Sequence, residues 1–177
     1  MVTNILFLPF RYGAHHPGRA AYFNTTEWTL DVKPHTQSSL QMTAIAMAAE
    51  MVSGRLNAIA GRFAFPVVVH VGEQVMVLRS MEHFLEALSA YRSLLMSQWL
   101  SLIVPKISDL EIDTDGQSRL SVRNQYYTTD GRELGTSQIT YYLEVTNAGQ
   151  KIRMVDFKEW PCPDLVAEYE PLQKLFR

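Results

Sequence analysis

The chain has 177 residues, of which 47% are hydrophobic and 19% charged, and its formal net charge at pH 7 is −2. This length fits one domain, and the hydrophobic content excludes an intrinsically disordered chain, which needs low hydrophobicity and high net charge. The weak net charge provides no basic surface for nucleic acid, and the single cysteine, Cys162, excludes a disulfide scaffold or a cysteine-rich zinc module.

No run of residues reaches the ~18 apolar positions of a membrane helix. The apolar stretch at 5–10 lacks the basic leader and the small-residue cleavage site of a signal peptide. We therefore expect a cytoplasmic protein with neither a membrane nor a nucleic acid as its partner.

The first predicted element is an irregular N-terminal extension over residues 1–36, where proline and glycine recur too often for a long helix. Its many aromatic residues predict that it packs on the body of the protein or on a partner subunit, for example as an arm exchanged across a dimer. Residues 37–60 are predicted to form one helix that contains Gly54, at a cost of ~1 kcal/mol, and ends at Gly61 in a left-handed cap. Its expected apolar face comprises Ile45, Ala49, Val52, Leu56 and Ile59.

Residues 67–78 predict a hairpin, because two β-branched or apolar runs flank a tight turn at Gly72-Glu73. A second helix is predicted over 81–102, with Ser80 as its N-cap and Pro105 as its stop. The apolar stripe of this helix is Phe84, Leu88, Tyr91, Leu95, Trp99 and Leu102.

Residues 106–160 predict four antiparallel strands, because strong turn signals separate alternating runs. The turns are Asp115-Gly116, Asp130-Gly131 and 147–149, and the last three strands are placed at 118–128, 135–146 and 151–160. Long strands joined by short turns predict a curved meander that covers the helices, followed by a C-terminal tail over 161–177.

Short motifs recur along this order of elements: Phe63-Ala64-Phe65-Pro66, Ser80-Met81-Glu82-His83-Phe84, the run 106–112, Asp130-Gly131 and the run 149–155. Together with a long helix, a short hairpin, a second helix and a meander, they resemble the nuclear transport factor 2-like superfamily, which includes SnoaL-like and ketosteroid-isomerase-like proteins. The resemblance covers residues 37–160 and excludes the N-terminal extension.

The resemblance implies an α+β fold of the cystatin-like or nuclear transport factor 2-like type, in which a cone-shaped, curved antiparallel sheet wraps around helices. It also implies an apolar pocket at one end of the cone and homodimers formed through the open sheet face. Some members are isomerases, cyclases or dehydratases, and others only bind small molecules or proteins, so the fold does not define the function.

Alternation along the strands predicts a polar group on the inner face of the sheet. Asn124 and Tyr126 continue one apolar strand face, Tyr141 belongs to a second, and Asp156 ends a third that starts at Ile152 and Met154. Asp156 would then be a general base, with a tyrosine or asparagine donating a hydrogen bond to a developing oxyanion. The opposite alternation, with Val155 and Phe157 inside, places Asp156 in solvent, and a register slip of one residue separates the two readings.

His70 lies in a valine-rich strand and is a second candidate acid or base, although a hydrogen-bonded strand histidine fits the same position. On the predicted helices, Tyr91, Trp99 and Met51 are expected to line the pocket, and ordinary core packing would explain the same positions.

Metal and cofactor sites are not predicted. His15 and His16 are adjacent and lack the ligand spacing of a zinc site, and no glycine-rich phosphate loop occurs.

Two functions remain open. The first is a SnoaL-like protein that binds a small apolar or aromatic molecule and acts on it as a cofactor-independent acid–base isomerase, cyclase or dehydratase. The second is a non-catalytic homodimeric binding or interaction module of the same fold. Its interface would be the outer sheet face, predicted to carry Gln125, Tyr127, Gln138, Thr140, Tyr142, Arg153 and Phe157.

Overall fold

The structure is a computed structural model that describes residues 37–112 and 117–161. The extension over 1–36, the turn at Asp115-Gly116 and the tail from Cys162 onward lie outside the described residues, so the predictions made for them stay predictions. Within the described ranges, no helix combines the length and the apolar character that crossing a membrane requires.

The first helical region is divided in two, whereas the sequence predicted a single helix. α1 spans Gln37–Ser53 and α2 spans Leu56–Ala60. Gly54, between them, has a φ of +77°, a left-handed conformation that favours glycine. It therefore ends α1, and the predicted cost of a glycine inside a helix does not arise.

The buried side of α1 also differs from the predicted face. Leu40, Ala44 and Ala48 are buried, whereas Ile45 is 40% exposed. The prediction followed the largest apolar side chains, but the helix turns its alanines toward the sheet, where small side chains allow a close approach. Gly61 caps α2 with a right-handed φ of −61°, so the predicted left-handed cap is wrong.

The second long helix, α3, spans Met81–Ser97. Its predicted N-cap is confirmed, because the Ser80 side chain accepts a hydrogen bond from the backbone N–H of His83 at 3.3 Å. The helix ends earlier than predicted, since Trp99 adopts a left-handed φ of +60° and a strand follows directly. Pro105 lies inside that strand, which is an edge strand and can accommodate proline.

The strands are β1 (Phe63–Val71), β2 (Gln74–Leu78), β3 (Leu100–Ile112), β4 (Ser118–Thr128), β5 (Glu133–Thr146) and β6 (Gly149–Glu159). They form one six-stranded sheet in the order β2-β1-β6-β5-β4-β3. Neighbouring strands are antiparallel except β1 and β6, which are parallel. The predicted hairpin therefore extends the predicted meander into a single sheet.

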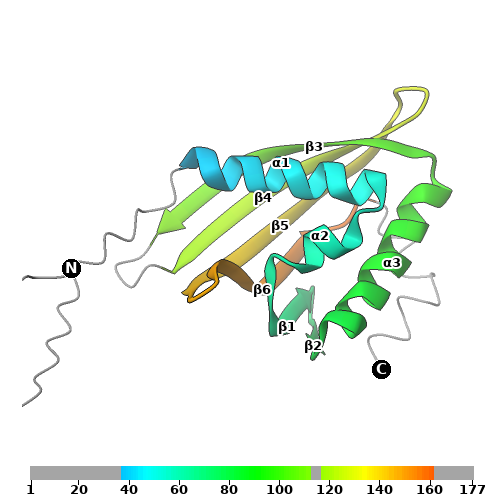
Figure 1. Cartoon of the computed structure of the whole chain (residues 1–177). Helices are drawn as coiled ribbons and strands as arrows, with labels where there is room; N and C mark the ends of the chain where they lie inside the picture. Colours follow the sequence, from blue (N-terminus) through cyan, green and yellow to red (C-terminus); the bar gives the residue numbers. More distant parts are fainter. Residues whose placement is uncertain (1–36, 113–116, 162–177) are drawn as a thin grey trace, which may run out of the picture. The chain divides into compact units, whose positions relative to one another are not determined.

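The helices lie on one face of this curved sheet (Figure 1). α1 runs beside β3, and α3 lies beside the end of the sheet that β1 and β2 form. The predicted fold class, an α+β fold with a curved, mostly antiparallel sheet and helices packed against it, is confirmed. We call the face that the helices cover the inner face, and the opposite face the outer face.

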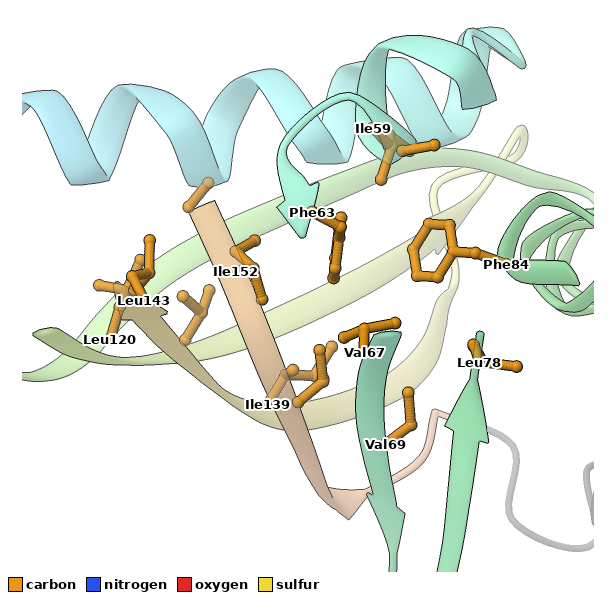
Figure 2. Close-up of a cluster of buried hydrophobic side chains, with 14 of the residues drawn as sticks. Ile59, Phe63, Val67, Val69, Leu78, Phe84, Leu120, Ile139, Leu143 and Ile152 are labelled. Carbon is orange, nitrogen blue, oxygen red and sulfur yellow. The ribbon is translucent and has the colours of Figure 1, made fainter. Parts of the chain in front are cut away.

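The hydrophobic core fills the space between the helices and the inner face. Figure 2 shows Ile59, Phe63 and Phe84 gathered where α2, β1 and α3 meet, and the rings of Phe63 and Phe84 lie 4.4 Å apart. Buried apolar side chains from β1, β4, β5 and β6 continue this core, among them Val67, Leu120, Ile139 and Ile152. Burial of each such side chain contributes ~1.5–3 kcal/mol, so this layer fixes the position of the helices over the sheet.

Candidate functional site

A partly open cavity of about 130 Å³ lies between the helices and the inner face. Most of its lining is apolar. The apolar side chains include Ala44, Met47, Ala48, Met51, Phe63, Val69, Met76, Phe84, Ala87, Leu88, Ile103, Val122, Ile139, Val155 and Phe157. Every helix and every strand contributes to the wall, so the cavity exists only in the assembled fold.

A connected group of polar side chains lies at this cavity. The Tyr126 hydroxyl is 2.9 Å from the Ser137 hydroxyl, and the Asn124 amide donates to Ser137 Oγ at 3.2 Å. The Tyr91 hydroxyl, from α3, is 3.4 Å from that of Tyr126. This network joins a helix to β4 and β5, and it satisfies polar groups that would otherwise be buried at a cost.

Tyr141 is the other tyrosine whose side chain lines the cavity from the sheet. Its nearest partners across the sheet are apolar, since it lies opposite Leu120 on β4 and Val155 on β6. Burial of the hydroxyl, and secondarily the nearby Tyr126, raises the pKa of Tyr141 above its ordinary value of 10. At neutral pH this side chain is therefore a neutral hydrogen-bond donor.

Three aromatic rings stand beside the cavity. Phe157 and Trp160 are stacked, and Tyr91 meets both of them edge-on. The backbone of Pro161, which follows Trp160, approaches Gly135 on β5 so closely that a Cβ there would clash with the Pro161 carbonyl oxygen. Gly135 thus allows the end of the last strand to pack against β5 and holds Trp160 near the cavity.

Most of the predicted pocket residues do lie at this cavity. Asn124, Tyr126, Tyr141, Tyr91 and Met51 are all among its lining residues. Trp99 is not, and its side chain is 72% exposed. The prediction for Trp99 was wrong because it assumed that α3 continues to residue 102, whereas the chain leaves the helix before Trp99.

Asp156, the predicted general base, lies on the outer face. Tyr142 on β5 lies opposite Met154, but the next residue, Leu143, lies opposite Ile152, so Arg153 is an extra residue that forms a bulge in β6. The bulge changes which residues face inward, and Val155 and Phe157 line the cavity instead. The predicted inner face that starts at Ile152 and Met154 is therefore wrong beyond the bulge at Arg153. Phe157, which was predicted for the outer face, lies on the inner face.

His70 is placed on the outer face as well. It lies directly opposite Asp156 in the parallel pairing of β1 with β6, and its neighbours Val69 and Val71 line the cavity. Asp156 also has Lys158 as a neighbour, with Nζ 4.0 Å from the carboxylate oxygen. The two predicted catalytic residues are thus brought together, but on the side of the sheet away from the cavity.

Sequence reasoning missed Ser137, Phe157 and Trp160 as site residues. For Ser137 a signal exists, because it continues the alternation of Ile139 and Tyr141 by one step. For Trp160 the sequence contains no such signal, since this residue follows the last strand and its position depends on the approach of Pro161 to Gly135.

The lining residues include no aspartate, glutamate, histidine, lysine or arginine within the described part of the chain. In the same ranges, no three side chains of the metal-ligating types come together. The site can therefore enclose an apolar molecule and form hydrogen bonds through neutral hydroxyl and amide groups.

No family model matches the chain, and a search of curated proteins finds no sequence match. Solved structures do match its fold. Aln2 from a Streptomyces species is 14% identical with a TM-score of 0.55, over 73% of this chain and 91% of Aln2. A candidate ketosteroid isomerase from Shewanella frigidimarina is 17% identical with a TM-score of 0.52, over 71% of this chain and 98% of its own.

A nuclear transport factor 2-like protein from Cytophaga hutchinsonii is 10% identical with a TM-score of 0.50, over 71% of this chain and 99% of its own. The predicted resemblance is confirmed at the level of the fold, which is that of nuclear transport factor 2-like and ketosteroid-isomerase-like structures. Likeness at these identities carries no activity to this chain, because the same fold supports unrelated functions.

Proposed function

We propose that this protein binds a small, uncharged, mainly apolar molecule in the cavity between the helices and the inner face, without acid–base chemistry by a cavity carboxylate or imidazole. The observation that carries the proposal is the lining of the cavity, which is mostly apolar and whose polar groups are the uncharged side chains of three tyrosines, an asparagine and a tryptophan. Enclosing a charged ligand there would remove its hydration without an opposite charge to replace it.

The size of the cavity favours a ligand of one ring. A cavity of 130 Å³ is close to the ~150 Å³ engineered cavity that remains dry and binds benzene.

The position of the titratable groups argues against the catalytic form of the sequence hypothesis. A general base must reach the proton that it removes, directly or through one water molecule. Asp156 and His70 lie across the sheet from the cavity, and the raised pKa of Tyr141 makes this phenol a donor and not a base at neutral pH.

The experiment is a titration of the full-length chain with toluene by calorimetry or NMR. Ala48 is buried at the cavity, so Ala48→Phe fills the space and should abolish toluene binding. Ala49 is the next residue of α1 and is exposed, so Ala49→Phe is the matched control and should bind toluene as the unmodified protein does. Toluene bound equally by both variants, or bound by neither the variants nor the unmodified chain, contradicts the proposal.

A second candidate function is homodimerisation through the outer face, as a binding or interaction module. It is supported by exposed apolar side chains on the edge strand β2, where Val75 and Val77 are 58% and 46% exposed. Val68, Met154 and Tyr142 continue from Val77 across the same face by direct strand pairing. A second copy of this face would cover the patch, as interfaces favour apolar and aromatic residues.

Light scattering of the full-length chain tests this candidate. Val77→Glu should shift a dimer to a monomer, whereas Val145→Glu, at a valine of β5 that is 48% exposed away from the patch, should not. A monomer of the unmodified chain at micromolar concentration rules this candidate out.

A further inference from the structure

Three of the four hydroxyl and amide side chains at the cavity already form hydrogen bonds within one network. Asn124, Tyr126 and Tyr91 are joined directly or through Ser137. Tyr141 stands apart from this network. Among the described residues its hydroxyl has no hydrogen-bond partner, although the side chain lines the cavity.

The strand pairing explains why no neighbour provides that partner. The residues directly opposite Tyr141 are Leu120 and Val155, neither of which carries a polar side-chain atom. Tyr141 is only partly buried and borders the cavity, so an acceptor that binds in the cavity can reach its hydroxyl and form the missing hydrogen bond.

We propose that the Tyr141 hydroxyl recognises a neutral oxygen on a monocyclic aromatic ligand, such as a phenol or an aryl carbonyl compound. The inference rests on the proposed function and names its ligand class. The ring of the ligand occupies the apolar space, and its oxygen accepts the hydrogen bond that Tyr141 donates.

The environment of Tyr141 also defines which ligands are rejected. Burial in an apolar wall disfavours a negative charge on this tyrosine and disfavours one on a bound ligand for the same reason. Carboxylates and ionised phenols should therefore bind much more weakly than neutral molecules of the same size.

Phenol and toluene are suitable probes, because they have nearly the same shape and differ in one oxygen. In Tyr141→Phe, phenol affinity should fall roughly two- to tenfold, the range expected for one neutral hydrogen bond. Toluene affinity should stay unchanged, which shows that the cavity is intact. Benzoate should bind more weakly than either probe to the unmodified chain.

The matched control is Tyr142→Phe, at the adjacent residue of β5, which faces the opposite side of the sheet. It should leave both affinities unchanged. The inference is overturned if Tyr141→Phe changes phenol and toluene by the same factor, if Tyr142→Phe has the same effect, or if benzoate binds as well as phenol. If the unmodified chain binds toluene while one of these results is obtained, the further inference is wrong but the proposed function is retained. If the unmodified chain binds neither toluene nor phenol, both the proposed function and the further inference are wrong.

Discussion

Phe157 stacks face to face on Trp160, with ring centroids 4.5 Å apart and ring planes inclined by 7°. The ring of Tyr91 on α3 meets Trp160 edge-on at 5.1 Å. These contacts attach the end of β6 to α3 beside the cavity, and aromatic pairs of this kind contribute ~0.5–1.5 kcal/mol beyond the burial of their area.

Replacement of Trp160 should therefore weaken both the fold and the cavity. Trp160→Ala is expected to lower the free energy of unfolding by about 2 kcal/mol, less than for a fully buried tryptophan because Trp160 is half-buried. Toluene affinity should fall as well. Urea unfolding and calorimetry measure the two effects, and Trp99→Ala, at a side chain that is 72% exposed, should change stability by less than about 0.5 kcal/mol.

A substitution at Trp99, unlike one at Trp160, is expected to raise the free energy of unfolding. Its φ of +60° is left-handed, which costs a residue with a Cβ ~1–2 kcal/mol relative to glycine. A glycine at this position would remove that cost, but part of the gain in stability is offset because glycine is more flexible in the unfolded chain. Trp99→Gly should raise the free energy of unfolding by up to about 1 kcal/mol in urea titrations, and a variant less stable than Trp99→Ala would contradict the interpretation.

A comparison of Gly135 with Gly131 distinguishes the cost of a Cβ at a positive φ from the cost of a steric clash. Both have a positive φ, +146° and +81°, but only at Gly135 would a Cβ meet the Pro161 carbonyl, whereas nothing lies within 4 Å at Gly131. Gly131→Ala should cost about 1 kcal/mol, and Gly135→Ala should cost at least about 2 kcal/mol and displace Trp160. Urea unfolding and tryptophan fluorescence measure this, and equal costs at the two positions would refute the role of the Pro161 contact.

Tyr141 predicts how stability depends on alkaline pH. Below pH 10 the phenol is neutral in both the folded and the unfolded chain, so it contributes no pH dependence. Above pH 10 the unfolded chain releases the proton while the folded protein retains it, because the folded pKa is raised. The unfolding free energy should then fall by up to about 1.4 kcal/mol per pH unit from this group.

Tyr141→Phe removes this contribution, so its stability should decrease less steeply above pH 10 than that of the unmodified chain. Tyr142→Phe, at the adjacent residue on the opposite side of the sheet, is the control. Identical pH profiles for the unmodified chain and Tyr141→Phe, measured by urea unfolding, would show that the Tyr141 hydroxyl is not buried in solution.

Local patterns in the sequence were sufficient for most of the fold. The hairpin at Gly72-Glu73, the cap at Ser80 and the long strands of the meander were predicted, because turn chemistry, capping and strand alternation act over a few residues. Alternation also placed Asn124, Tyr126 and Tyr141 on the inner face, since no bulge interrupts β4 between Leu120 and Tyr126.

The sequence by itself thus determined the class of fold, the order of its elements and the tyrosine and asparagine side chains of the cavity. Only the tertiary structure decided the inward face of β6, because the extra residue at Arg153 is defined by pairing with β5 and changes the alternation beyond it. The same holds for Trp99, whose exposure depends on where α3 ends and β3 begins, and for Trp160, which directly precedes the Pro161 that approaches Gly135. These features arise from contacts between distant segments, which local periodicity does not encode.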